Sequence, residues 1–246
     1  MKNVKKAKFA LLFAFTVLAL ASALNAEPGP GWGPDIQLTT HTAYDWRSSI
    51  TQTGDGKIWM VWGSMRTGNF DIWYTTSSDG GATWTAHTQL TTHTADDDSP
   101  SITQTSDGKI WVVFHSYRAS PNNPELYYMT SSDGGANWST AVRLTTDSNF
   151  DLDPSIVQLS DGKIFVAWQS DRIKVWDPEG QIWIAQDDIY YTTSSNGGAT
   201  WTPDTRLTTD PRDDVDPSVT QTADGKIWIA FGSSRLDPFD IYYTTS

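Results

Sequence analysis

The sequence predicts an all-β protein, a β-propeller of four four-stranded antiparallel blades. The motif Asp-Gly-Lys-Ile occurs four times in the 246 residues, with its aspartate at Asp55, Asp107, Asp161 and Asp224. A turn segment that contains Gly-Gly lies before each of the last three motifs, at a constant distance. A repeat of roughly 50 residues, built from short strands and glycine-rich turns, is typical of propeller blades.

Each repeat is expected to form four strands. In the second repeat these are Ser101–Gln104, Ile110–Phe114, Leu126–Thr130 and Trp138–Leu144. An Asp-Gly turn joins the first two strands, and such a turn between β-type runs is a strong hairpin signal. The second strand has apolar residues at successive positions, which is expected where neighbouring blades cover both of its faces.

The two ends of the chain are expected to close the ring. Leu38 lies 17 residues before Asp55, and a leucine stands at the same distance before each later motif. The residues around Leu38 are therefore predicted to form a fourth strand, and Ile241–Ser246 a third strand. Pairing between these two pieces would complete the last blade and leave no open edge. The alternative is a partial arc of a larger propeller with six or seven blades.

Residues 1–26 are interpreted as a secretory signal peptide, which leaves residues 27–246 for the propeller. Four lysines precede the apolar run Phe9–Leu20, and small residues follow it. This run is shorter than a typical membrane span. We expect a secreted or cell-surface protein without stable membrane insertion after cleavage, and the alternative is an uncleaved N-terminal anchor.

The composition excludes several classes of partner. Removing the four lysines of the signal segment from the 17 basic residues leaves 13, against 29 acidic residues. Such an acidic chain is a poor ligand for nucleic acid or anionic membranes. Cysteine is absent, so stability must come from packing, for which the chain has 13 Trp, 9 Tyr and 9 Phe. We expect a monomer that binds a glycan or an extracellular protein.

The Gly-Gly turn segment has the pattern Ser-x-Asp-Gly-Gly-x-Thr/Asn-Trp. It resembles the Asp-box, or bacterial neuraminidase repeat, of sialidase-type propellers. In that family the motif lies on the face away from the active site and occurs in catalytic and non-catalytic members. The resemblance therefore implies structural roles for six residues of the three segments, which are Asp79, Asp133, Asn196, Trp84, Trp138 and Trp201.

A second set of repeated residues carries charge. An aspartate lies seven residues after each of the four leucines that precede the motifs, Leu38, Leu90, Leu144 and Leu207. An arginine lies 11 residues after the aspartate of each Asp-Gly-Lys-Ile motif. The aspartates are Asp45, Asp97, Asp151 and Asp214, and the arginines are Arg66, Arg118, Arg172 and Arg235. Both positions emerge at the same end of a four-stranded blade, so we expect one Asp–Arg pair per blade near the channel mouth. The alternative is a ring of guanidinium groups that binds a carboxylate.

The resemblance to sialidases favours that alternative. Sialidases bind the sugar carboxylate with three arginines, use a tyrosine paired with a glutamate as nucleophile, and use an aspartate as acid/base. Carried over to this chain, the four arginines would form the clamp, and Asp151 or Glu179 would be the acid/base. The chain departs from the family pattern, because it lacks a Phe/Tyr-Arg-Ile-Pro motif and Glu179 has no evident tyrosine partner.

Two features break the repeat and are candidates for ligand binding. Arg47 stands where the third and fourth repeats have Asp153 and Asp216, and the third repeat carries the insertion Ile173–Asp187. The predicted ligand-binding residues are Arg47, Asp45, Asp97, Asp214, Trp176 and Trp183. For the insertion, the alternative is an extended hairpin with its tryptophans folded onto its own blade.

No cofactor is expected. The acidic runs Asp96–Asp98 and Asp213–Asp216 supply the oxygen ligands that Ca²⁺ prefers, but no calcium-loop spacing is present, so bound Ca²⁺ stays an alternative and no metal ligand is assigned. The expected function is that of a non-catalytic carbohydrate- or protein-binding scaffold module. The alternatives are a divergent exo-glycosidase of sialidase type, and a fragment whose catalytic residues lie in other blades.

Overall fold

The computed structural model describes residues 31, 33–177, 180–236 and 238–246. The chain divides into two units, Met1–Thr40 and His41–Ser246, and every strand among the described residues lies in the second. The predicted signal peptide, residues 1–26, lies outside the described residues. In the described part of the chain, no helix is long and apolar enough to cross a membrane.

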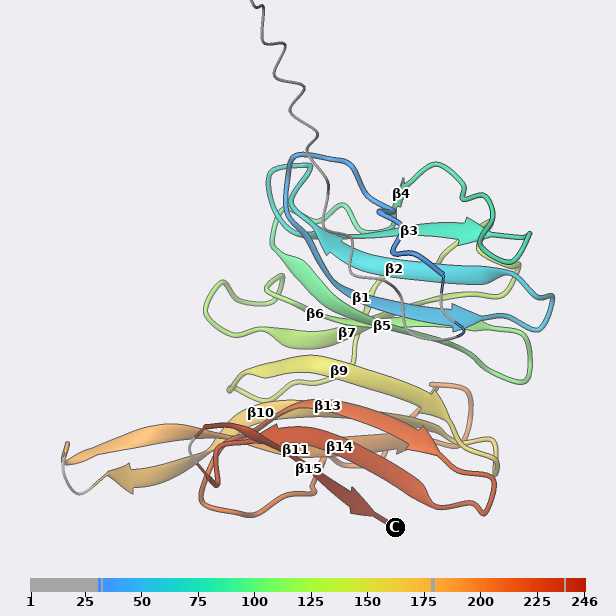
Figure 1. Cartoon of the computed structure of the whole chain (residues 1–246). Coiled ribbons are helices and arrows are strands. Elements are labelled where there is room, and N and C mark those ends of the chain that lie inside the picture. The colour runs from blue at the N-terminus through green and yellow to red at the C-terminus, as the bar shows by residue number, and fades with distance from the viewer. Residues whose placement is uncertain (1–30, 32, 178–179, 237) are drawn as a thin grey trace, which may run out of the picture. The chain divides into compact units, whose positions relative to one another are not determined.

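Residues 41–246 form four antiparallel blades, which confirms the predicted all-β propeller fold (Figure 1). The first blade consists of β1 (Asp45–Gln52), β2 (Ile58–Ser64), β3 (Asp71–Ser77) and β4 (Thr88–Gln89). The second consists of β5 (Asp97–Gln104), β6 (Ile110–Ser116), β7 (Glu125–Ser131) and β8 (Val142–Arg143). The third consists of β9 (Asp151–Gln158), β10 (Ile164–Asp177), β11 (Ile182–Ser194) and β12 (Thr205–Arg206). The fourth consists of β13 (Asp214–Gln221), β14 (Ile227–Ser233) and β15 (Asp240–Thr245).

The outermost strands are shorter than the sequence predicts. Each of β4, β8 and β12 has two residues, although the apolar pattern favours a longer strand between Trp138 and Leu144. Trp138 belongs to the turn segment instead, because its ring packs against the core cluster between the first and second blades. A two-residue strand makes few ladder contacts, so it depends on the turn that tethers it to the third strand.

The predicted closure by an N-terminal strand is not what the structure shows. Residues 33–40 form no strand, and the fourth sheet contains β13, β14 and β15 alone. The short outermost strands supply the physical reason. Residues 36 and 37 would have to form such a two-residue strand without a tethering turn, and the entropy of bringing distant segments together would oppose it.

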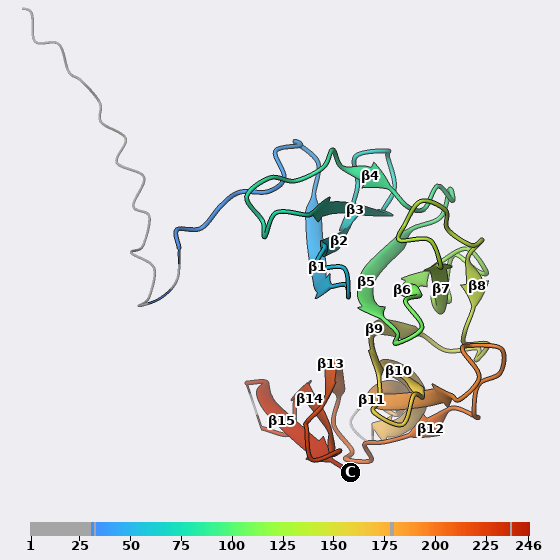
Figure 2. The same cartoon turned by 90° about the vertical axis from the view of Figure 1, so that its right-hand side faces the viewer.

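Successive blades contact each other in chain order, through their inner strands β1, β5, β9 and β13 (Figure 2). Among the described strands, β1 and β13 make no contact with each other. The four blades of the predicted propeller are therefore present, and the predicted pairing that would close them is absent from the described residues.

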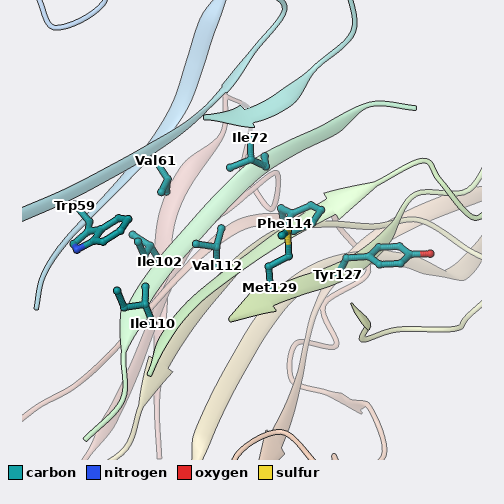
Figure 3. Close-up of a cluster of buried hydrophobic side chains, with 9 residues drawn as sticks. All are labelled: Trp59, Val61, Ile72, Ile102, Ile110, Val112, Phe114, Tyr127 and Met129. Atoms are coloured by element: carbon teal, nitrogen blue, oxygen red, sulfur yellow. The ribbon is translucent and has the colours of Figure 1, made fainter. Parts of the chain in front are cut away.

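The core lies between neighbouring blades. At the first junction, Trp59, Val61 and Ile72 of the first blade meet Ile102 and Val112 of the second (Figure 3). All seven residues of β6 are buried, as predicted for a strand that is covered on both faces. Burial of these apolar side chains is the main stabilising term of each junction.

Two kinds of hydrogen bond also recur at each junction. The backbone N–H groups of Ile102, Ile156 and Val219 donate to a serine hydroxyl of the preceding blade, at 3.3, 3.2 and 3.1 Å. The side-chain Oε1 atoms of Gln104, Gln158 and Gln221 accept from a turn N–H of the preceding blade, at 2.7, 2.6 and 2.6 Å. The junctions are thus chemically equivalent, and their polar groups fix the register of one blade against the next.

Candidate functional site

The four repeated arginines lie at one end of the blades, where the inner strand begins and the second strand ends; we call this end the mouth. Their guanidinium groups lie 2.9, 2.5, 2.7 and 2.8 Å from the aspartates of their own blades, in the pairs Arg66–Asp45, Arg118–Asp97, Arg172–Asp151 and Arg235–Asp214. Each guanidinium also lies over an aromatic ring, as Arg118 lies 4.8 Å from the ring centroid of Tyr127. The expected Asp–Arg pair is present in every blade.

These pairs argue against a ring of arginines that is free to bind a carboxylate. Arg66 donates to both carboxylate oxygens of Asp45, at 2.9 and 3.0 Å. Arg172 forms a second ion pair, with Asp204 at 2.7 Å. Asp151, the acid/base alternative, is fully buried and accepts a bond from Trp168 Nε1 at 2.9 Å. Burial raises the pKa of Asp151, and Arg172 opposes that rise. These groups stabilise the blades, because each guanidinium is already paired with the aspartate of its own blade.

The Gly-Gly turn segments lie at the opposite end of the blades. The carboxylate of Asp79 accepts bonds from the N–H and the hydroxyl of Thr83, at 2.9 and 2.5 Å. Equivalent bonds from Asn137 reach Asp133, and these hydrogen bonds lower the pKa of Asp79 and of Asp133 to about 2. Asn196 accepts the same backbone bond at Oδ1, at 2.9 Å.

Two of the three tryptophans of these segments, Trp138 and Trp201, pack on the preceding blade. The ring of Trp138 meets the edge of Trp59 at 6.0 Å, and that of Trp201 meets Trp111 at 6.3 Å. Both contacts join a turn to the core of a junction. This geometry is the structural role that the Asp-box resemblance implies.

Each inner strand has one bulge near the mouth. The bulge residue has a left-handed backbone with φ of 51° or 52°, and these residues are Arg47, Ser99, Asp153 and Asp216. This conformation costs a residue other than glycine about 1 kcal/mol, and a bulge turns side chains away from the regular alternation of a strand. The side chains of these four bulge residues line one open hollow at the mouth. The bulges thus bring together a position whose residue type differs between repeats.

A second cavity, of about 250 Å³, lies at the mouth among the first three blades. Six of its lining residues together form what we call the mouth cluster, and all of them except Asp153 differ from their equivalents in the other blades. They are Trp46, Arg47, Asp98, His115, Tyr117 and Asp153. Phe70 adds an aromatic wall, because its ring stacks on that of Trp46 at 5.4 Å with an angle of 12°.

Asp98 is the most constrained acid of the mouth cluster. Its side chain is 5% exposed, and its Oδ2 atom accepts a hydrogen bond from Trp46 Nε1 at 2.9 Å. Its Oδ1 atom is buried and has no hydrogen-bond partner among the described residues. Burial raises the pKa of Asp98, while hydrogen bonds from Ser99 and Trp46 and the charge of Arg47 oppose the rise. A buried oxygen without a partner is unfavourable unless something binds to it.

His115 faces Asp98 across the pair of strands β5 and β6. Its ring is 6% exposed, and its Nδ1 atom has no hydrogen-bond partner in the described part of the chain. Burial lowers the pKa of His115 to about 3, and the charge of Arg47 contributes. The imidazole is therefore neutral at physiological pH and offers one donor and one acceptor.

Arg47 crosses from the first blade to the third. Its Nη1 atom forms an ion pair with Oδ1 of Asp153 and donates to the hydroxyl of Ser99 at 2.7 Å. The guanidinium also lies 5.3 Å from the ring centroid of Trp46. Of the predicted ligand-binding residues, Arg47 is the one that belongs to the mouth cluster.

The insertion forms an extended hairpin, made by the ends of β10 and β11 and projecting beyond the other strands (Figure 1). Trp176 and Trp183 pair across it with their ring centroids 5.5 Å apart, and they are 46% and 66% exposed. The extended hairpin agrees with the alternative given for the insertion, but its tryptophans pack on each other and face solvent and are not folded onto the blade. Glu179 lies outside the described residues.

The acidic runs have separate roles in the structure. Asp97 pairs with Arg118 and Asp214 with Arg235, whereas Asp98 lies in the mouth cluster. No group of three or more His, Cys, Asp or Glu side chains within the described ranges is arranged to hold a metal ion. These acids therefore serve ion pairs and the mouth cluster.

Sequence reasoning missed Trp46, Asp98, His115 and Tyr117. The signal that identifies them is variation inside a repeat, because none of these four residues recurs at its position in another blade. Asp98 corresponds to Trp46, Leu152 and Val215, and His115 corresponds to Gly63, Gln169 and Gly232. Residues that the blade fold requires recur in every blade. Residues that do not recur are therefore candidates for ligand binding.

The BNR repeat-like domain family matches residues 34–166 of the chain. No curated protein matches the chain. Solved structures that resemble it include a protein of unknown function from Dyadobacter fermentans, which is 15% identical with a TM-score of 0.65 and an alignment covering 83% of this chain and 66% of that one.

Two of the similar structures carry named activities. A Hadza microbial sialidase is 16% identical with a TM-score of 0.62, over 81% of this chain and 44% of that one. The GH93 alpha-L-arabinofuranosidase of Fusarium graminearum, in complex with arabinobiose, is 14% identical with a TM-score of 0.65, over 82% of this chain and 62% of that one. At these identities the likeness shows the fold. The chain spans less than two thirds of the length of these structures.

Proposed function

The chain belongs to the BNR repeat-like domain family, and on that premise we propose that it is a non-catalytic carbohydrate-binding module whose ligand lies in the mouth cluster. One observation carries the proposal. Asp98 Oδ1 and His115 Nδ1 are buried without hydrogen-bond partners among the described residues, and both residues line the cavity beside a half-exposed tryptophan. A ligand that supplies the absent hydrogen bonds would stabilise both groups.

Sugar hydroxyl groups meet these requirements, because each hydroxyl can both donate and accept. A carboxylate accepts from a hydroxyl, and a neutral imidazole donates to one or accepts from one. The indole of Trp46, which is 48% exposed, offers an apolar surface of the kind on which a sugar ring lies. The sialidase and the arabinofuranosidase of the same fold act on sugars, which supports this ligand class.

The test is a binding measurement. Arabinobiose and sialyllactose are titrated into the protein by calorimetry, after a glycan array has been screened. We expect saturable binding without turnover, and loss of at least tenfold in affinity in Asp98→Asn and His115→Ala. Trp183→Ala is the matched aromatic control on the hairpin, and equal loss there would move the site away from the mouth cluster. A protein ligand, with no glycan bound, would contradict the proposed ligand class.

A divergent exo-glycosidase is the second candidate function, and one observation favours it. Asp98 is buried with a raised pKa, while Asp153 in the same cluster is ion-paired with Arg47. Two carboxyl groups in contrasting environments suit an acid and a stabilising carboxylate of glycoside hydrolysis. Release of a fluorescent aglycone from aryl arabinofuranosides or sialosides, lost in Asp98→Asn, would establish this activity and overturn the non-catalytic assignment.

We also propose that the protein is exported. The lysines and the apolar run of the first 26 residues support this, as does a binding site suited to extracellular glycans. Amino-terminal sequencing of protein collected outside the cell is expected to begin near Glu27. Full-length protein that stays inside would contradict export while leaving the binding site unaffected.

A further inference from the structure

The cavity at the mouth carries more negative than positive charge. Asp96, Asp98 and Asp153 line it, and Arg47 is the one cationic residue of its described lining. Burial lowers the pKa of His115 to about 3, so its imidazole adds no charge at neutral pH. Arg47 is already ion-paired with Asp153, and within the described ranges no ion pair reaches Asp96 or Asp98. Two carboxylates of the cavity therefore lack a cationic partner.

Most other cations of the described chain are engaged elsewhere. Four lysines lie in the Asp-Gly-Lys-Ile turns, at the end of the blades opposite the mouth. Charges separated by more than about 8 Å are largely screened at physiological salt. Six arginines are paired with a carboxylate of their own blade, namely Arg66, Arg118, Arg143, Arg172, Arg206 and Arg235. A small cation is therefore attracted to the cavity.

The two carboxylates lie near each other and near Tyr117. Oδ1 of Asp96 accepts from the N–H of Phe70 at 2.9 Å, and its Oδ2 has no hydrogen bond in the described part of the chain. Burial raises the pKa of Tyr117, and the charges of Asp96 and Asp98 contribute. Burial also raises the pKa of Asp98, and the charge of Asp96 contributes. A positive group beside Asp96 and Asp98 would relieve this repulsion.

Aromatic rings form the other walls of the cavity. Trp46 and Phe70 are stacked, and Tyr117 lines the same space. The face of an aromatic ring attracts a cation, and the guanidinium of Arg47 already lies 5.3 Å from the ring centroid of Trp46. The cavity volume of about 250 Å³ is below the roughly 300–1,000 Å³ that is typical of pockets for drug-sized ligands. A single sugar ring suits a cavity of this size.

The lining also contains buried polar groups whose hydrogen bonds are incomplete. Asp98 is 5% exposed and His115 is 6% exposed, and both line the cavity. Asp98 Oδ1 and His115 Nδ1 have no hydrogen-bond partner among the described residues. These groups differ from ordinary surface acids, which water solvates, because burial denies them that solvation. The negative charge of the cavity is therefore part of a binding site.

We propose that the cavity selects glycans that carry a protonated amine, with an amino-sugar ring against Trp46 and its ammonium group beside Asp96 and Asp98. The preference rests on the proposed function, because the amine is recognised as part of a bound sugar. An ammonium group has three N–H donors for carboxylate oxygens. N-acetylation removes this charge. An acidic sugar is disfavoured, because Arg47 is already paired with Asp153.

The experiment compares two trisaccharides by calorimetry at pH 6.5 in 0.15 M NaCl. One contains three glucosamine units, as in chitosan, and the other contains their N-acetylated counterparts. The amine of glucosamine, like an α-amino group with a pKa of about 7.7 to 8.0, is mostly protonated at this pH. We expect the chitosan trisaccharide to bind at least tenfold more tightly than the acetylated one, and sialyllactose to bind more weakly than both.

The outcomes separate this preference from glycan binding itself. Equal affinity for the two trisaccharides would overturn the amine preference and leave the proposed function in place. Absence of binding by both trisaccharides, by arabinobiose and by every glycan of the array would overturn both. Sialyllactose that binds as tightly as the chitosan trisaccharide would contradict the role assigned to the unpaired carboxylates.

Asp96→Asn removes one charge and keeps the shape of the side chain. Its amide oxygen can still accept from Phe70, and unchanged circular dichroism would show that the fold is retained. The ratio of the two affinities is expected to fall to near one. Asp213→Asn is the matched control, because Asp213 has the equivalent position in the fourth blade, accepts from the N–H of Asp187 at 3.2 Å and lies outside the cavity lining. An equal fall in both variants would show that the charge of the whole mouth attracts the amine, and would overturn selection by the cavity.

Tetralysine separates an amino sugar from a cationic peptide, because it carries amines without a sugar ring. We expect it to bind at least tenfold more weakly than the chitosan trisaccharide. Equal or tighter binding of tetralysine would show that the cavity recognises cations without regard to the sugar, and would overturn the ligand class.

Discussion

Trp46 donates its indole N–H to the Oδ2 atom of Asp98 over 2.9 Å, and this bond links the first blade to the second at the mouth. The two residues occupy equivalent positions in successive inner strands, so the contact exists only because the repeat varies there. The bond leaves Asp98 Oδ1 without a hydrogen-bond partner among the described residues, and both Asp98 and Trp46 line the same cavity. One interaction therefore orients both the aromatic and the acidic part of the mouth cluster.

Trp46→Phe keeps an aromatic ring and removes that bond. We expect the pKa of Asp98 to rise further, because a donor to the carboxylate is lost. Ligand affinity is expected to fall about tenfold, in line with a lost hydrogen bond to a charged group. Calorimetry measures the affinity, and NMR titration measures the pKa. Trp84→Phe, in a turn at the opposite end, should change neither quantity, and an unaltered affinity in Trp46→Phe would contradict this role.

Gly63 makes room for Asp98. A methyl group at Gly63 would overlap the Oδ1 atom of Asp98, so Gly63→Ala is expected to displace the carboxylate and to weaken ligand binding at least tenfold. Gly232→Ala is the matched control in the fourth blade, since the nearest atom to its added carbon is Val215 Cγ2 at 3.4 Å. Equal binding by the two variants would show that the position of Asp98 does not matter for the ligand.

The Asp–Arg pairs are predicted to affect stability more than ligand recognition. Arg118→Ala would leave Asp97, which is completely buried, without its cationic partner at 2.5 Å. Breaking such a pair typically lowers the free energy of unfolding by about 3 to 5 kcal/mol. Urea denaturation measures this. Lys163→Ala, which removes the exposed pair with Asp161, is the control and should cost less than about 0.5 kcal/mol.

Most of the architecture could be predicted from the sequence, because residues required by the blade recur at fixed spacing. The Asp-Gly turns, the paired charges and the hairpin of the insertion all follow from local pattern. Ring closure did not follow, because it depends on whether a two-residue strand forms without a tether, and no residue pattern near Leu38 reports that. The repeat spacing around Leu38 and Ile241–Ser246 indicates where the blades begin and end, but it wrongly predicts that these two segments pair.

The mouth cluster was predicted only through Arg47. In the run Asp96–Asp98 the three acids look alike in sequence, but adjacent residues of a strand point to opposite sides. Asp97 consequently meets Arg118, while Asp98 meets Trp46 of another blade. Contacts between variable positions of different blades, and the bulges that aim them, arise from the tertiary arrangement of the blades.

The turn segments predict a dependence of stability on acid. The pKa of Asp79 is lowered to about 2 by its bonds from Thr83, below the value of 3.8 for an unperturbed aspartate. A lowered folded-state pKa contributes stability above pH 4 that is lost as pH falls toward 2. Asp79→Asn should make unfolding less sensitive to pH in that window, as the natural Asn196 does in the third blade. Thermal midpoints at pH 2 to 5 measure this, and identical profiles of the variant and the unaltered protein would contradict it.

Asp187, at the base of the hairpin, predicts a dependence of the opposite sign. Burial and the nearby charges of Asp213, Asp171 and Asp188 raise the pKa of Asp187 to about 6, from an ordinary value of 3.8. Charging the group is therefore costlier in the folded state, and the folded protein loses stability as pH rises from about 4 through 6. Asp187→Asn removes that cost, so we expect it to raise the free energy of unfolding by about 1 to 2 kcal/mol at pH 7.5, less than the full shift implies because solvent screens the partly exposed side chain. At pH 4 the difference in urea should shrink to about 0.5 kcal/mol or less, because Asp187 is then protonated when folded and only partly ionised when unfolded. A stabilisation of the same size at both pH values would show that the amide acts through a new hydrogen bond and not through the removed charge.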